Sequence, residues 1–273
     1  VVNTGGIWID RILDKHRAGK PPKILGTKGT HIAVRLPSEC KGYGIATLNR
    51  KNQPFYCLPW GNLHYIGPTE TLYEGDLDKI TPLAEERDWL LAEANHLLPT
   101  LRLTTSDVMF SWAGVRPLTW DPDLPMGNRN RVLHDLAEDG MPNVFALTGG
   151  PVMTHRSAGE EISQAIQKKL GSRGTPRALS FASKFPSPLD VDMLKELTVP
   201  SAPAWVKDML KAEHVVHLSD VILRRAGLAW FSKLGPEQIA MIGRSIGKEA
   251  GWGEKKTDEE IAGAIAELAT LQR

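Results

Sequence analysis

The sequence predicts an α+β fold in which a region of mixed strands and helices is followed by a small all-helical region. Three observations support this. Residues 29–36 and 107–112 alternate between apolar and polar side chains, as strands with one buried face do. The segment 173–203 holds five of the 19 prolines and resembles a connector. After about residue 205 the helix signals follow one another without a strand pattern between them.

The composition is that of an ordinary globular chain. Its 33 Lys and Arg residues balance 32 Asp and Glu residues, giving a formal net charge of +1. This balance argues against a general nucleic-acid or anionic-membrane surface, although a local basic pocket stays open. No stretch reaches the roughly 18–20 apolar residues of a membrane-spanning helix. The two cysteines, Cys40 and Cys57, make no disulfide framework, so we expect a reducing compartment and no metal site.

The first residues are typical of the interior of a domain. Residues 1–3 resemble the end of a buried strand, Thr4-Gly5-Gly6 the turn after it, and Ile7 to Leu13 the first turns of a helix. The first ten residues lack the basic flank and the apolar core of a signal peptide. Because a domain rarely begins on a buried strand, we expect that an N-terminal portion is missing.

The middle of the chain predicts strands around one helix. In the strand 29–36, Ile32, Val34 and Leu36 share one face. Shorter strands are predicted over 53–60 and 64–67, joined by a turn at 61–62. A helix is predicted over about 82–98, with Thr81 as its N-cap and Pro82 in its first position. The strand over 107–112 follows.

A last strand and a helix precede the connector, and further helices follow it. The apolar strand 143–147 leads into Thr148-Gly149-Gly150 and then into a helix that Gly171 closes. Beyond the connector, Ser219 and Pro236 mark two helix starts. The capping-box pattern over 257–260 predicts a third.

Three local patterns could carry chemistry. A strand that ends in glycines against a helix N-terminus can bind an anion or a carbonyl group, or can be an ordinary turn. Arg116, between Gly114 and Pro117, could grip a carboxylate or a phosphate, or form a surface salt bridge. Arg129 and Arg131 add cations. His31 at a strand start could be an acid or base, or a structural histidine.

Taken together, these segments resemble a known family. SWAGVRPL, KGTHIAV, LPWGNLHYIGPTETLYEGD and the turn from Gly-Gly to Thr-His-Arg occur in the same order in the FAD-dependent glycerol-3-phosphate dehydrogenases. Those enzymes belong to the wider D-amino-acid-oxidase-like flavoproteins. VVNTGGIWIDRI resembles the late strand and turn of their FAD domain, and HLSDVILRRAGLAW through EAGWGEKKTDEEIAGAIAEL resembles their C-terminal helical domain.

The resemblance implies the domain organisation. Residues 1–172 would be the C-terminal part of an FAD-dependent oxidoreductase domain. Within it, a mostly antiparallel substrate-binding sheet would span about residues 21–139. Residues 1–20 and 140–172 would be remnants of the FAD domain. A proline-rich connector over 173–204 and a helical domain over 205–273 would follow. The G-x-G-x-x-G turn of the family lies upstream of the V-N-A-x-G-P-W segment, so this chain would lack the part that grips the ADP half of FAD and would be inactive alone.

The implied activity is the oxidation of sn-glycerol 3-phosphate to dihydroxyacetone phosphate, with hydride transfer to flavin N5. His31 matches a candidate base, and Arg116 a candidate catalytic and substrate ligand. Arg129 and Thr154 are further candidates for substrate binding. The candidates for FAD binding are Gly5, Gly6, Gly149, Gly150, Met153 and Thr154.

The sequence also departs from the family pattern on the substrate side. Pro151 replaces a lysine, which removes a cation, a side-chain donor and a backbone N–H. Glu70 stands at the aspartate of G-T-T-D, and Asn130-Arg131 replace an aspartate and a tyrosine. Two alternatives therefore stay open: a non-catalytic binding or regulatory descendant, and an amine or amino-acid oxidase on the same scaffold.

The resemblance also sets expectations about partners. We expect a small phosphorylated polyol as substrate, a quinone or another electron acceptor, and no nucleic acid. The expected location is the cytoplasm, with peripheral contact at the inner face of the membrane and a homo-oligomer as open options.

Overall fold

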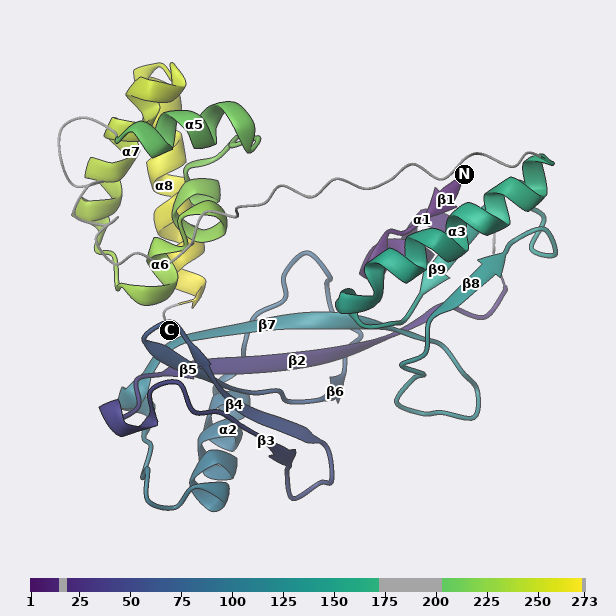
Figure 1. The fold of residues 1–273 in the computed structure, drawn as a ribbon, viewed down its shortest axis with the longest axis horizontal. Helices are drawn as coiled ribbons and strands as arrows, with labels where there is room; N and C mark the ends of the chain where they lie inside the picture. Colours follow the sequence, from purple (N-terminus) through teal and green to yellow (C-terminus); the bar gives the residue numbers. More distant parts are fainter. Residues whose placement is uncertain (15–18, 172–202, 272–273) are drawn as a thin grey trace. The chain divides into compact units, whose positions relative to one another are not determined.

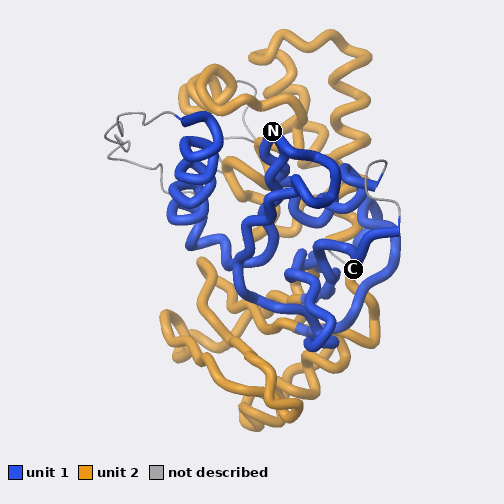
Figure 2. The backbone as a smooth tube through the Cα atoms, turned by 90° about the vertical axis from the view of Figure 1, so that its right-hand side faces the viewer, with its two compact units in different colours: residues 1–30, 69–81, 113–181 blue, residues 31–68, 82–112, 182–273 orange. Residues whose placement is uncertain are grey.

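The computed structural model describes residues 1–14, 19–171 and 203–271. The chain divides into two compact units, shown in Figure 2. Unit 1 comprises residues 1–30, 69–81 and 113–181, and unit 2 comprises residues 31–68, 82–112 and 182–273. Two long strands, β2 (Ile24–Val34) and β7 (Val108–Thr119), contribute residues to both units.

Unit 1 contains a small sheet with strand order β1-β9-β8. β1 (Val2–Asn3) runs parallel to β9 (Phe145–Thr148), and β8 (Val132–Asp135) runs antiparallel to β9. Each strand that runs in parallel is followed by a turn and a helix (Figure 1). These helical elements are η1 (Gly6–Trp8), α1 (Ile9–Leu13), η5 (Val152–Thr154) and α3 (His155–Leu170).

The core of this sheet is apolar and lies under α1. Ile9 and Leu13 of α1 pack with Leu136 and Ala146. Unit 1 also holds the first part of β2, with β6 (Thr71–Leu72) antiparallel to it, and the last part of β7. Of the substrate-side candidates in unit 1, Arg116 therefore lies on a strand, whereas Arg129 lies in a loop and Thr154 in η5.

Unit 2 is built on an antiparallel sheet. β3 (Ile45–Leu48), β4 (Pro54–Trp60), β5 (Leu63–Gly67) and the end of β2 are neighbours in that order. One face packs on α2 (Ala84–Leu97), whose Leu90, Leu91 and Ala94 meet Ile32, Val34 and Ile66 of the sheet. Two short 3-10 turns, η3 (Ser38–Cys40) and η4 (Thr105–Asp107), complete this part.

The opposite face of this sheet is aromatic and meets the C-terminal helices. Trp60 lies 5.2 Å from Trp230 and 5.2 Å from Phe231, measured between ring centroids. The C-terminal elements are α5 (Ala204–Ala212), η6 (Asp220–Arg225, a π-helix), α6 (Leu228–Phe231), α7 (Pro236–Ala250) and α8 (Glu254–Leu271). They enclose an apolar core of their own, which includes Leu218, Ile222, Ile242 and Ile246.

The predicted α+β fold with a helical C-terminal region is confirmed. Most predicted elements are present, and α3 ends at Gly171, which has a φ of +66° as its role in closing the helix requires. The predicted connector lies outside the described residues, apart from 203 and 204, and the domain boundaries stay a prediction.

Several boundaries differ, for identifiable reasons. The strand 107–112 continues to Thr119, so Arg116 lies within β7 and not beyond its end. Helix α2 is capped at Leu83 instead of Thr81, because the buried Glu86 side chain accepts the Leu83 N–H at 2.8 Å. Helix α8 begins at Glu254, since Thr257 Oγ1 donates back to the Gly253 carbonyl instead of capping a new helix.

Candidate functional site

Two glycine turns lie at one edge of the small sheet in unit 1. Val2 pairs with Phe145 and Asn3 with Ala146 in parallel register, so both strands end at the same edge. The turn after β1 carries Gly5 and Gly6, and the turn after β9 carries Gly149 and Gly150. The structure therefore brings these four cofactor candidates to the carboxyl edge of a parallel pair, where α/β sheets bind nucleotide ligands.

The first turn is organised by Asn3, a residue that the sequence-based reasoning missed. Asn3 is buried, its Nδ2 donates to the Ile9 carbonyl at 3.2 Å, and its Oδ1 accepts the Gly5 N–H at 3.0 Å. Gly6 has a φ of +57° and an open space where a side chain would begin. Asn3 could have been recognised from its place at the end of a buried strand and just before a Gly-Gly turn, since asparagine side chains form hydrogen bonds with nearby backbone groups.

The second turn is closely packed against the segment around Asn130. A Cβ on Gly149 would lie 2.3 Å from the Asn130 carbonyl oxygen, so only glycine fits there. The Gly149 N–H donates to the Pro117 carbonyl and the Gly150 N–H to the Arg129 carbonyl, at 3.3 and 3.1 Å. The N–H groups of both glycines are therefore already hydrogen-bonded to carbonyl groups of neighbouring chain segments.

Beyond this turn the chain exposes apolar side chains at the beginning of η5. Val152 and Met153 are 84% and 76% exposed, which is unusual for two adjacent apolar residues. Thr154 Oγ1 donates to the Pro151 carbonyl at 2.8 Å. Met153, a predicted cofactor residue, is thus on an accessible surface, whereas Thr154 is used within the turn.

Arg131 is a second residue whose place the sequence did not reveal. Its Nε donates to Glu161 Oε2 at 2.9 Å, and its Nη1 lies 3.3 Å from Thr154 Oγ1 and 3.0 Å from Ser157 Oγ. The guanidinium group therefore ties β8 to the start of α3. The Arg131 side chain is 22% exposed, so it is not a solvated surface cation.

Arg116 lies across the backbone of β2. A Cβ on Gly29 would lie 2.1 Å from Arg116 Nη2 and 2.6 Å from its Cζ, so the absence of a side chain at Gly29 makes room for the guanidinium group. The Nη1 atom of Arg116 is buried. The guanidinium group of Arg116 is therefore fixed over the β2 backbone, and its role as a ligand for a carboxylate or phosphate stays a prediction.

Arg129, the second predicted substrate cation, is ion-paired with Glu70 through Nη2 and Oε1. The Glu70 segment is fixed on β2, because Thr69 Oγ1 accepts the Thr30 N–H at 2.8 Å and the Thr69 N–H donates to the Thr30 carbonyl at 3.1 Å. Arg129 is 58% exposed and Glu70 is 12% exposed. The carboxylate offsets the positive charge that the prediction assigned to phosphate binding.

His31 belongs to unit 2, whereas all the other candidate residues belong to unit 1. Its half-buried ring is stacked on Trp112, with centroids 5.5 Å apart and planes 8° from parallel. Tyr65 meets the His31 ring edge-on at 5.8 Å and 64°. His31 is therefore held between two aromatic rings on the face of the sheet that carries Trp60 and Trp112.

The remaining chemistry of the described chain is limited. Within residues 1–14, 19–171 and 203–271, no group of three or more His, Cys, Asp or Glu side chains could hold a metal ion. In the same part of the chain, none of the helices combines the length and the apolarity that crossing a bilayer requires. Cys40 and Cys57 are free thiols, and burial raises the pKa of Cys57 to about 11.

Comparisons with known proteins agree with this geometry. Glycerol-3-phosphate dehydrogenase of Synechocystis sp. is 29% identical over 315 positions, which cover 96% of this chain and 57% of that protein. Aerobic glycerol-3-phosphate dehydrogenase of Staphylococcus aureus strain USA300 is 25% identical over 171 positions, which cover 62% of this chain and 30% of that protein. This chain thus spans little more than half the length of the first of these relatives.

A solved structure shares the fold. Glycerol-3-phosphate dehydrogenase from Bacillus halodurans, complexed with FAD, matches with a TM-score of 0.73 and 23% identity over 100% of this chain and 62% of that chain. The family model described as FAD dependent oxidoreductase matches residues 1–165, which include both glycine turns and both long strands. The chain therefore belongs to the FAD dependent oxidoreductase family.

Proposed function

We propose that this chain forms the substrate-binding part, and one wall of the flavin site, of a dehydrogenase that oxidises sn-glycerol 3-phosphate or a related hydroxy substrate. The observation that carries the proposal is the position of the Arg116 side chain. It extends from β7 over Gly29 of β2, and no side chain separates its guanidinium group from the β2 backbone. The names of the relatives, glycerol-3-phosphate dehydrogenases from two bacteria, support the same choice.

The residues present fit a flavin. The turns after β1 and β9 lie at the same edge of the sheet, and Gly6 in the first turn leaves open space at its Cα. Val152 and Met153, which follow the second turn in the sequence, expose apolar surface. A flat aromatic ring system needs close backbone approach together with apolar contacts. Gly5, Gly6, Gly149, Gly150 and Met153 would line this wall. When bound, FAD supplies the hydride acceptor.

The side chains divide the remaining work. Arg116 would bind the phosphate or a substrate oxygen and so fix the position of the carbon that is oxidised. His31 would take the proton of the hydroxyl group at one of its ring nitrogens, because an imidazole ring can serve as a general base. The Arg129–Glu70 pair would adjust the positive charge available to the phosphate. The electrons would then pass to a quinone or another acceptor.

One observation favours a second candidate. Because Glu70 already accepts a hydrogen bond from Arg129, the positive charge of Arg129 is offset, unlike that of the second arginine in a phosphate site with two arginines. A site with Arg116 as its principal cation would suit a substrate carboxylate, as in an amino-acid oxidase on the same scaffold. The two candidates differ in the anion that competes with the substrate.

The test is a flavin titration of the dehydrogenase that contains this chain. We expect that protein, mixed with excess FAD and freed of unbound cofactor, to retain the flavin absorption band at ~450 nm. Under anaerobic conditions, sn-glycerol 3-phosphate should bleach this band, and inorganic phosphate should slow the bleaching. Bleaching by glycine or D-alanine alone would favour the amino-acid oxidase. Retention of FAD without bleaching by any of these substrates would contradict the dehydrogenase proposal and favour the non-catalytic descendant.

A further inference from the structure

A continuous set of aromatic rings connects His31 with the C-terminal helices inside unit 2. The His31 ring is stacked on Trp112, and the Trp112 ring lies 5.7 Å from Trp230 of α6. Trp60 touches both tryptophans, at 5.4 Å from Trp112 and 5.2 Å from Trp230. The angles between these tryptophan planes, 50° to 73°, are those of tilted and edge-to-face contacts, which aromatic pairs prefer over face-to-face stacking.

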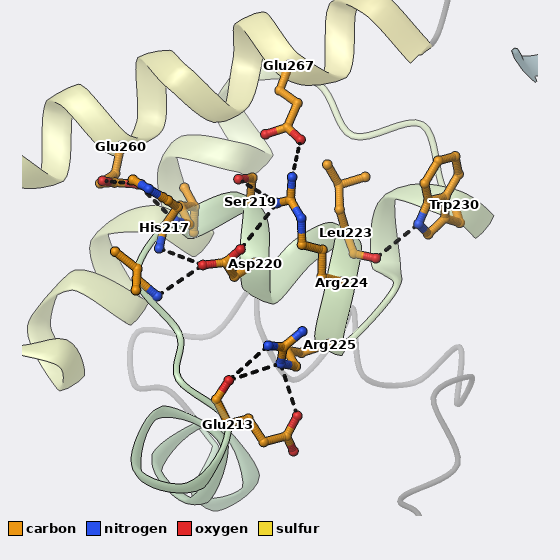
Figure 3. Close-up of polar contacts among 12 residues, drawn as sticks. Glu213, His217, Ser219, Asp220, Leu223, Arg224, Arg225, Trp230, Glu260 and Glu267 are labelled. Carbon is orange, nitrogen blue, oxygen red and sulfur yellow. Dashed lines mark hydrogen bonds and ion pairs between the residues drawn. The ribbon is translucent and has the colours of Figure 1, made fainter. Parts of the chain in front are cut away.

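Trp230 is fixed at its polar end. Its Nε1 donates to the Leu223 carbonyl at 3.0 Å, as Figure 3 shows. Leu223 belongs to the π-helix η6, whose next two residues are held by hydrogen bonds to other segments. Arg224 Nη2 donates to Glu267 Oε1 of α8 at 2.7 Å, and Arg225 donates to the Glu213 carbonyl at 2.9 Å. The indole of Trp230 is therefore presented to the sheet from a hydrogen-bonded base.

Phe231, the next residue of α6, packs against the turn between β4 and β5 and against Trp60. A Cβ on Gly61, in the turn between β4 and β5, would lie 2.5 Å from the Phe231 ring. The ring of Phe231 also meets Trp60 edge-on at 5.2 Å. The contact between α6 and the aromatic face thus involves two adjacent aromatic residues, and it restricts how far the Trp230 ring can move relative to Trp112.

The plane of a histidine ring needs such contacts to be defined. Rotation about χ2 of histidine is broad, so the backbone of β2 alone does not fix the direction of its ring nitrogens. In this chain the parallel stack on Trp112 and the edge contact with Tyr65 restrict that rotation. A base must hold its nitrogen within hydrogen-bond reach of the proton it takes.

We propose that Trp112 is a positioning residue that sets the ring plane of His31, and that Trp230 holds Trp112 from the C-terminal helices. The inference rests on the proposed function only where it treats His31 as the base. The C-terminal helices would then contribute to the reaction through packing, without touching the substrate or the cofactor.

The test uses the resonances of the His31 ring in the full chain. In histidine-labelled protein, His31→Gln identifies the His31 signals among those of the eight histidines. Because the ring lies on the face of an indole, we expect these signals upfield of their unstacked positions. Trp112→Leu should remove this displacement, and Trp230→Leu should reduce it. Trp89→Leu is the matched control, since Trp89 packs against Phe55 on the opposite face of the same sheet.

If Trp230→Leu fails to fold, the more conservative variant Trp230→Phe still tests the proposal. Trp230→Phe retains a ring but loses the donor to Leu223, so it should move the His31 signals in the same direction by a smaller amount. Unchanged His31 signals in folded Trp230 variants would overturn the role of Trp230. An equal displacement in Trp89→Leu would show general loosening of unit 2 and would overturn the specific coupling.

Turnover separates this inference from the proposed function. In FAD-loaded protein, Trp112→Leu should lower kcat about tenfold and Trp230→Leu about threefold with little change in KM, since misplacement of a reacting group affects the chemical step. If His31→Gln leaves turnover unchanged while the resonances respond as expected, the role of His31 as base fails and the packing coupling stands. If the resonances do not respond, the coupling fails whatever the turnover.

Discussion

The clearest single-residue relation in the candidate site is that between Gly29 and Arg116. A methyl group at position 29 would overlap the guanidinium group, whose atoms lie 2.1 to 2.6 Å from the position that Cβ would occupy. The overlapping group is the end of a long side chain, so it can be displaced without moving either strand. Gly29→Ala should therefore affect ligand binding more than folding.

We expect Arg116→Ala to raise KM for a phosphorylated substrate on the order of 100-fold, since a charge-assisted pair is lost. Gly29→Ala should raise KM in the same direction by about tenfold or more, because it displaces the same cation. Gly114→Ala, where a Cβ meets no atom within 4 Å, is the control and should change KM less than about twofold. Steady-state kinetics of the FAD-loaded dehydrogenase that contains this chain measures all three. A normal KM in Arg116→Ala would exclude Arg116 from substrate binding.

The pair of Arg129 and Glu70 makes a different prediction at the same scale. Glu70→Gln should strengthen the binding of inorganic phosphate about two- to fivefold at low salt, because it removes a carboxylate that offsets the Arg129 charge; the gain is limited by the 58% exposure of Arg129. Isothermal titration calorimetry measures the change. Glu74→Gln, an exposed residue of the same segment, removes the same charge elsewhere and should have a smaller effect. Equal effects of both variants would mean that Arg129 does not contact the phosphate.

At the scale of elements, α2 is tied to the turn between β3 and β4 by one buried carboxylate. Glu93 has no exposed surface, and it accepts the Arg50 N–H at 2.8 Å and Arg50 Nε at 2.7 Å. Burial favours the neutral carboxyl group, but the two hydrogen bonds from Arg50 outweigh it, so the pKa of Glu93 lies below its ordinary value of 4.5. The helix and the hairpin are thus joined by a contact that depends on pH.

Glu93→Gln should lower the free energy of unfolding at pH 7 by about 1–3 kcal/mol, because it weakens hydrogen bonds to a buried charge. A lowered carboxyl pKa stabilises the fold above pH 4.5, and this contribution is lost as the pH falls through the lowered pKa. The difference between Glu93→Gln and the parent chain should therefore shrink as the pH falls below 4.5. Urea unfolding at two pH values measures it, with the exposed Asp88→Asn on the same helix as control. A difference that is independent of pH would contradict the assignment.

The elements also show what sequence patterns can and cannot predict. Clean alternation and glycine turns located β4, β5, β9 and α3 to within a few residues. The first part of β2 was missed because Gly26 interrupts it and because Thr27 and Lys28 are buried polar residues. The strands β3, β6 and β8 were also missed, since β3 and β6 are exposed along their whole length and β8 has no buried residue, so none shows the alternation of a strand with one buried face.

At the scale of the whole molecule, motif resemblance predicted the family and the cofactor, and it named residues that the structure places on strands, in turns, in a loop and in η5. The contacts between these residues could not be predicted. The stack of His31 on Trp112 joins positions 81 residues apart, and the Arg129–Glu70 pair joins positions 59 residues apart. Such pairings depend on tertiary packing, which no local pattern contains.

The packing of α6 against the hairpin of β4 and β5 also joins two distant segments of unit 2 into one cooperative structure. Phe231 fills the space over Gly61, which has a φ of +60°. An alanine at this position would meet two penalties: the left-handed backbone, at about 1–2 kcal/mol, and displacement of the Phe231 ring. Gly42 separates these penalties, because its φ is +80° and no atom lies within 4 Å of the position of its Cβ.

We therefore expect Gly42→Ala to cost only the backbone penalty, and Gly61→Ala to cost roughly 1–3 kcal/mol more, since it overpacks an aromatic contact. Hydrogen exchange should show where the additional stability is lost. In Gly61→Ala, the amides of α6 and of the β4–β5 turn should both exchange faster than in the parent chain, whereas in Gly42→Ala they should exchange at the parent rates. If the two variants lost equal stability and α6 kept its protection, the helices would not be coupled to the sheet through Phe231. The segment carrying Trp230 would then be free to move independently of the face that holds His31.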